Sequence, residues 1–139
     1  MKKFLVFAFT LIISTAIFAH AALISVDDMG NGQIYIEGGF SDGSSAGGME
    51  LILVKDKAYN GPEDTFNGKE IIFRGKLKDD GSFIIPKPAT EKYEVIMNAG
   101  VGHVATKKGP ALTDSEKSEW ENAVKNFDFG DWKEFMLEK

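Results

Sequence analysis

The sequence contains no cysteine and only two histidines, His20 and His103, among its 139 residues. The lack of cysteine excludes disulfides, and it also excludes zinc or copper(I) sites built from thiolates. The fold must therefore be held by its hydrophobic core alone. Basic residues are outnumbered by acidic ones, 16 to 21, which argues against nucleic-acid binding because that function needs a basic face.

Long apolar runs are scarce too, and the one that is present lies at the N-terminus. Two lysines precede a mainly apolar stretch of 15 residues, Phe4 to Phe18. A membrane-spanning helix needs about 20 apolar residues, and a basic start, a short apolar run and small residues in that order are typical of an export signal. We expect residues 1–19 to be a signal peptide, cleaved after Ala19 or Ala21, with an uncleaved anchor as the alternative.

Cleavage would place the mature protein in the periplasm or outside the cell. It would retain 14 basic and 21 acidic side chains, a net charge of −7. Such a chain is expected to be soluble and not embedded in a membrane, and its charge would attract cations only weakly and without specificity.

Short segments of alternating or continuous apolar residues follow, separated by glycine-bearing turns such as "DDMGNG" and "KDDG". Alternation with β-branched and aromatic residues is typical of strands. We predict strands at residues 22–26, 33–40, 49–55, 70–77, 82–86 and 93–99, with 103–107 continuing the pairing. Short strands at this spacing predict an all-β fold, a single antiparallel β-sandwich over residues 20–110.

The pattern becomes helical in the last segment, residues 111–139. Thr113 and Glu116 have the spacing of a capping box, and apolar residues then recur at helical spacing at Trp120, Val124 and Phe127. A second short helix is expected after a glycine at position 130. We expect this C-terminal α-helical tail to dock on the sandwich and cover an open edge or face, with a partner-binding helix as the alternative.

Three motifs occur in order along the sandwich: "GFSDG" at 39–43, "GKLKDDGSF" at 75–83 and "NAGVGH" at 98–103. Together they resemble the periplasmic accessory component of nickel and cobalt importers of the energy-coupling-factor type. That family carries a small transthyretin-like domain similar to the regulatory domain of carboxypeptidases. The resemblance covers residues 34–105 and implies a transthyretin-like or Ig-like sandwich, a role in metal uptake, and membrane transporter subunits as partners.

The sequence departs from that family in two respects. Members often carry transmembrane helices that attach the domain to the importer, and no apolar run after the signal is long enough to form one. Members also tend to have a histidine near the mature N-terminus. His20 lies in that region, but its spacing to the first strand does not align firmly.

The two histidines are the candidate metal ligands. If the signal is cut after Ala19, His20 becomes the first residue, and its α-amine and imidazole Nδ1 can close a chelate ring to which His103 would add a third nitrogen. Nickel(II) and copper(II) favour such nitrogen-rich sites. Nickel or cobalt is the expected ion, copper is the alternative, and no organic cofactor is expected. A cut after Ala21 would discard His20 and the chelate.

Each candidate also has an ordinary structural interpretation. A histidine between glycines can be a turn residue that bonds to the backbone. Carboxylates could contribute ligands instead of the imidazoles, although turn formation explains them equally well; these are Asp27, Asp28 and Asp42. The scattered methionines Met29, Met49 and Met97 are interpreted as core filling.

The sequence carries no motif of a hydrolase, zinc protease or phosphate loop, and we predict that the protein is not an enzyme. The favoured function is that of an exported accessory protein for nickel or cobalt uptake, which binds the ion transiently or contacts the transporter. The alternative is a non-metal interaction module that docks on another periplasmic protein.

Overall fold

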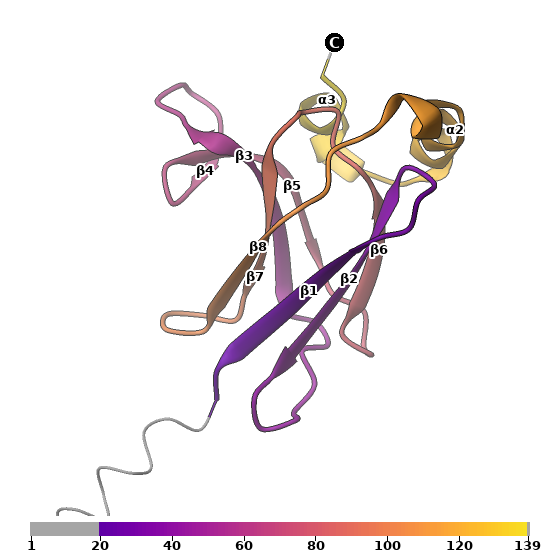
Figure 1. Ribbon diagram of the computed structural model, residues 1–139. Coiled ribbons are helices and arrows are strands. Elements are labelled where there is room, and N and C mark those ends of the chain that lie inside the picture. The colour runs from indigo at the N-terminus through magenta and orange to yellow at the C-terminus, as the bar shows by residue number, and fades with distance from the viewer. Residues whose placement is uncertain (1–19, 139) are drawn as a thin grey trace, which may run out of the picture.

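The computed structural model describes residues 20–138, so the predicted signal segment, residues 1–19, lies outside the described residues. Two antiparallel sheets form a sandwich-like body (Figure 1). The first sheet has the order β1-β2-β6, formed by β1 (Ala22–Asp28), β2 (Gln33–Phe40) and β6 (Ser82–Pro86). The second has the order β4-β5-β3-β7-β8, formed by β4 (Thr65–Phe66), β5 (Lys69–Lys76), β3 (Glu50–Ala58), β7 (Tyr93–Asn98) and β8 (Val104–Lys108).

The expectation of an all-β sandwich-like fold is confirmed, and the observed strands follow the predicted ones closely. Residues 103–107 were expected to continue the pairing, and β8 does so as the second arm of a hairpin with β7. The short strand β4 was not predicted. It pairs with the start of β5 inside a glycine-bearing irregular segment, where two residues give no alternation to detect.

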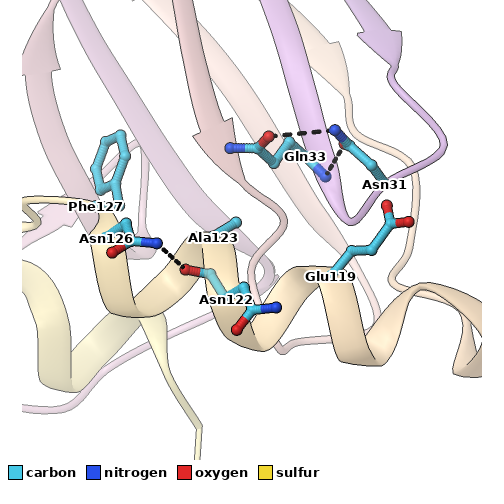
Figure 2. A pocket seen from close by; sticks show the side chains of 7 residues that line it. All are labelled: Asn31, Gln33, Glu119, Asn122, Ala123, Asn126 and Phe127. Carbon is cyan, nitrogen blue, oxygen red and sulfur yellow. Dashed lines mark hydrogen bonds between the residues drawn. The ribbon is translucent and has the colours of Figure 1, made fainter.

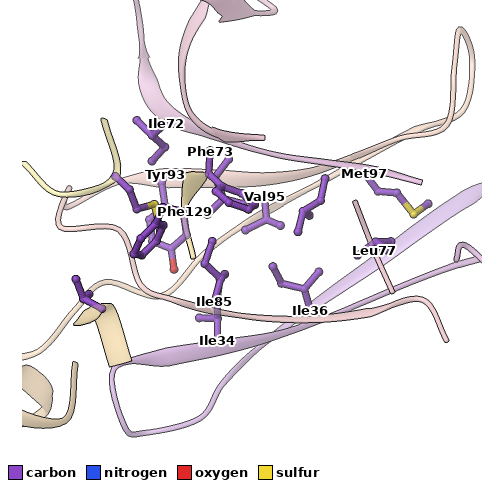
Figure 3. Close-up of a cluster of buried hydrophobic side chains, with 14 of the residues drawn as sticks. Ile34, Ile36, Ile72, Phe73, Leu77, Ile85, Tyr93, Val95, Met97 and Phe129 are labelled. Carbon is purple, nitrogen blue, oxygen red and sulfur yellow. The ribbon is translucent and has the colours of Figure 1, made fainter. Parts of the chain in front are cut away.

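The core lies between the two sheets and follows from the alternation of the strands (Figure 3). Ile34 and Ile36 of β2 are fully buried there, and they face Leu51 and Leu53 of β3 within the same cluster. Burying one such side chain is worth about 1.5–3 kcal/mol. With no disulfide in the chain, burial of this kind supplies the main stabilisation of the fold.

The central strand β3 is apolar on both of its faces. Leu51 and Leu53 point into the core between the sheets, whereas Ile52 and Val54 belong to a second buried cluster on the outer face of the five-stranded sheet. Trp132 packs against this outer cluster. The continuous apolar run of β3 is therefore explained by cover on both sides.

The C-terminal tail packs on the sandwich, and its Trp132 covers the outer cluster together with Phe66 of β4. It contains η1 (Asp114–Glu116), α2 (Lys117–Asn126), η2 (Gly130–Trp132) and α3 (Lys133–Met136). Val124, Phe129 and Met136 are buried in the main core cluster. The expectation that the tail docks on its own sandwich is thus confirmed. Within residues 20–138, no helix has the length and apolarity needed to cross a bilayer.

A buried lysine fastens the tail to the sandwich. The Lys87 side chain is completely buried, and its Nζ donates to both carboxylate oxygens of Glu116 at 2.9 Å and to Asp28 Oδ2 at 3.0 Å. The Trp120 indole N–H donates to the Lys87 carbonyl at 2.8 Å. Lys87, the residue that follows β6, therefore joins the β1–β2 hairpin to the start of the tail.

The same cluster completes the expected capping box. The Thr113 backbone N–H donates to Glu116 Oε2 at 3.0 Å. The hydrogen bond from Lys87, followed by that from Thr113, lowers the pKa of the Glu116 carboxyl from 4.5 to about 2. Because this folded-state pKa lies below the ordinary value, the ionised carboxylate stabilises the fold above pH 4.5, and that contribution is lost as the pH falls toward 2.

We predict that Lys87→Met lowers the free energy of unfolding by about 3–5 kcal/mol, because it leaves Glu116 charged, buried and without its partner. Urea unfolding followed by circular dichroism measures this loss, and the variant should lose less stability than the wild type between pH 4.5 and 2. Lys57→Met, at an exposed position of β3, is the matched control and should change stability by no more than about 0.5 kcal/mol.

A double variant, Lys87→Met with Glu116→Leu, should recover most of the loss because it removes the unpaired buried charge. Equal unfolding midpoints for Lys87→Met and Lys57→Met would contradict the anchoring role.

Candidate metal site

His20 and His103 lie at one end of the sandwich, in the same pocket. The pocket has a volume of about 260 Å³ and is lined by His20, Phe40, Ser44, Met49, Ala99 and His103. Phe40 ends β2 in the first sheet, whereas Met49 and Ala99 flank β3 and β7 in the second. The pocket therefore opens where the ends of the two sheets meet. Figure 1 shows the tail helices at the opposite end of the molecule.

His20 is positioned by the loop that follows β2. The Ala21 backbone N–H donates to Ser41 Oγ at 2.8 Å, and the Ser41 N–H donates to the Ala21 carbonyl at 2.9 Å. These two bonds hold the residues before β1 against the "SDG" motif. His20 Nδ1 then lies 2.6 Å from Asp42 Oδ2.

The Asp42 carboxylate is itself fixed by its own turn. Its Oδ1 accepts from the Ser44 N–H at 2.9 Å and from Ser44 Oγ at 2.6 Å. These bonds from Ser44, and the nearby His20, lower the pKa of Asp42. An ionised carboxylate only accepts hydrogen bonds, so the proton of a neutral His20 ring resides on Nδ1 and the Nε2 lone pair is free.

His103 is held in the tight turn between β7 and β8. The Ala99 N–H donates to the His103 carbonyl and the His103 N–H donates to the Gly100 carbonyl, both at 2.9 Å. Gly100 and Gly102 have positive φ angles of 110° and 78°, which glycine adopts readily and other residues do not. His103 Nδ1 lies 3.2 Å from the carbonyl oxygen of Val101.

The two imidazoles thus share one arrangement. In each ring Nδ1 faces an oxygen that can only accept, which leaves Nε2 as the nitrogen available to a ligand. Metal-binding histidines commonly have this arrangement, because the acceptor on one nitrogen fixes the tautomer and makes the other nitrogen more basic. The expected chelate through Nδ1 of His20 differs from this geometry, because Asp42 occupies that nitrogen.

The remaining sequence candidates lie elsewhere, with one exception. Asp27 and Asp28 end β1 at the far side of the β1–β2 hairpin, where Asp28 binds Lys87. Met97 is fully buried in the core, as expected, but Met29 is 42 % exposed, so its interpretation as core filling is wrong. Met49 is half-buried and lines the pocket beside both histidines.

Met49 is the site residue that the sequence interpretation missed. The register of the second sheet pairs Glu50 with Asn98, so Met49 stands just outside β3, next to the turn that carries His103. Nothing in the local sequence signals this, because the pairing joins residues 48 positions apart. Within residues 20–138, no three side chains of His, Asp or Glu gather closely enough to form a metal site by themselves.

A second hollow, of about 360 Å³, lies between the β1–β2 hairpin and α2 (Figure 2). Three of its four carboxamides already bond to nearby groups: Asn31 Nδ2 donates to Gln33 Oε1 at 3.3 Å, and Asn126 Nδ2 donates to the Asn122 backbone carbonyl at 3.0 Å. Glu119 is its one ionisable lining residue. It lacks the convergent, oriented donors of the histidine pocket, which is therefore the better candidate site.

Comparison with protein-family models, with curated proteins and with solved structures gives no match. The residues of the pocket and the resemblance of the sequence motifs are therefore the basis for a functional proposal.

We predict that both histidines carry their neutral-state proton on Nδ1, because each Nδ1 faces an oxygen acceptor. Nitrogen NMR of the uniformly labelled protein above pH 8 distinguishes the two tautomers. Asp42→Asn should shift the His20 ring toward a mixture of tautomers, because an amide can also donate, whereas His103 should not change. A Nδ1-protonated His20 that is insensitive to Asp42→Asn would contradict the role given to this carboxylate.

Proposed function

We propose that the protein is an exported accessory protein of transition-metal uptake, which holds the ion transiently between His20 and His103. The resemblance of its motifs supports nickel or cobalt as the cargo and a transthyretin-like or Ig-like class for the sandwich, and copper remains the alternative ion. The observation that carries the proposal is that two imidazoles, 83 positions apart in the sequence, line one pocket, each with its Nδ1 against an oxygen acceptor.

Transient binding fits the small number of protein ligands. Two imidazoles leave coordination positions open, so an incoming ligand from a partner can join the ion before the first ligands leave. A cut after Ala19 would create an α-amine at His20, but this amine chelates together with Nδ1, which Asp42 occupies, so the proposed protein ligands are the two Nε2 atoms. A carrier in the periplasm or outside the cell needs exchangeable binding of this kind, and no catalytic step is required of it.

Exposed apolar side chains close to the histidines in the chain, here called the rim, support contact with a partner. Three of the exposed large apolar side chains are near the histidines in the chain: Leu23 is 53 % exposed, Val101 102 % and Val104 41 %. β1, which carries Leu23, also lies against β8, which carries Val104. Apolar side chains around a pocket can bury against a partner protein, and membrane transporter subunits are the partner that the resemblance suggests.

The same rim favours the second candidate function, a non-metal module that docks on another periplasmic protein. In that case the histidines would be polar contacts within an interface. The two functions differ in one measurable respect, since only the first requires the isolated protein to bind a metal ion.

We predict that the exported protein, with its N-terminus identified by mass spectrometry, binds nickel(II), cobalt(II) or copper(II) with a dissociation constant in the micromolar range or below, about −8 kcal/mol. Isothermal titration calorimetry measures this affinity. His103→Ala should weaken it at least about tenfold, because the ring supplies one of few ligands and even outer-shell partners are worth about 10–100-fold. Affinity should also fall on acidification, because only neutral imidazole binds a metal.

Val101→Ala is the matched control, because it changes an exposed side chain in the same turn and should leave the affinity unchanged. If correctly processed protein that retains His20 binds none of these ions, the metal function is refuted and the interaction module becomes the favoured function.

A further inference from the structure

The donor set of the pocket contains a sulfur atom that the proposed function does not use. Met49 is half-buried and lines the pocket with His20 and His103. Its backbone is held on both sides, since its N–H donates to the Ala46 carbonyl at 3.1 Å and its carbonyl accepts from the Leu77 N–H at 2.9 Å. The side chain that carries the thioether therefore projects from a fixed backbone position at the end of the second sheet.

Met49 packs against the main core cluster, but unlike the other methionines of residues 20–138 it also lines the pocket of the two histidines. Met97 and Met136 are 0 % and 1 % exposed and belong to the core, whereas Met29 is 42 % exposed at the far end of the β1–β2 hairpin. A half-buried methionine beside two imidazoles is thus a single occurrence in the described part of the chain. Its three rotatable bonds let the sulfur adjust toward an ion.

We propose that Met49 is a third ligand and that the pocket binds copper(I) in preference to nickel(II) or cobalt(II). This inference rests on the proposed metal-binding function and selects copper, the alternative ion, in place of nickel or cobalt. Thioether sulfur is a soft ligand that selects copper(I), and imidazole is also a good ligand for copper. Carboxylates, which suit harder ions, do not line the pocket; the nearest one, Asp42, is bonded to His20 and Ser44.

The coordination number points the same way. Copper(I) accepts few ligands, whereas nickel(II) and cobalt(II) in this pocket would need water or ligands of a partner to complete their coordination. Within residues 20–138 no third His, Asp or Glu joins the two histidines. Two imidazole nitrogens and one thioether sulfur would complete a copper(I) site without any further group from the protein.

The test is a competition titration of the exported, processed protein with copper(I) and bicinchoninate under anaerobic conditions, beside calorimetry with nickel(II). Met49→Leu keeps the size and apolarity of the side chain and removes the sulfur. We expect it to weaken copper(I) binding at least about tenfold and to change nickel(II) binding by less than about twofold. Met29→Leu removes an exposed methionine outside the pocket and should change neither affinity.

X-ray absorption spectroscopy of the copper(I)-loaded wild type gives a reading that does not depend on a variant. Because the chain has no cysteine, a sulfur atom bound to copper must be a thioether, and we expect one in the wild type and none in Met49→Leu. Equal copper(I) affinities for Met49→Leu and Met29→Leu, or a copper shell without sulfur, would overturn the role of Met49 while leaving a histidine site intact. Loss of all metal binding would instead refute the proposed function itself.

Discussion

The interaction on which the arrangement of this chain depends is the contact of one buried ammonium group with two carboxylates. Lys87 leaves the first sheet, and its Nζ contacts Asp28 of the β1–β2 hairpin and Glu116 at the start of the tail. If one partner were removed, the remaining buried charge would have to be hydrated, which would oppose the docking of the tail. Trp120, one of the apolar residues of α2, donates a hydrogen bond to the Lys87 carbonyl. The ion pairs of Lys87 and the apolar contacts of α2 therefore meet at the same residue.

The opposite end of the molecule is organised by turns. The loop after β2 folds back on Ala21, and its Asp42 fixes the ring of His20. The turn after β7 fixes the ring of His103 through its own carbonyl groups. Antiparallel pairing brings these two turns to the same end, because β2 and β7 both finish there. The pocket is therefore a product of strand direction, and its chemistry comes from the side chains that short turns can carry.

Local patterns were sufficient to predict most of the fold. Alternation at Ile34 and Ile36 predicted β2 to the residue, and the capping box of Thr113 and Glu116 predicted the start of the tail. Long-range pairs were not predictable. Lysine usually marks solvent, so nothing indicated that Lys87 would be buried, and Met49 joined the site only through the register of β3 with β7. The two histidines were selected from the sequence by their rarity. Their ring orientation and tautomer depend on Asp42 and on a backbone carbonyl, which the sequence did not indicate.

The placement of the helical tail has a practical consequence for handling the protein. Because the helices pack at the end of the sandwich remote from the pocket (Figure 1), an affinity tag or fluorophore appended after Lys139 would sit far from the imidazoles and leave their approach clear. An extension joined directly to His20 would crowd the mouth of the pocket and consume the amine that processing would create. Labelled protein for binding assays should therefore carry its additions on the carboxyl side.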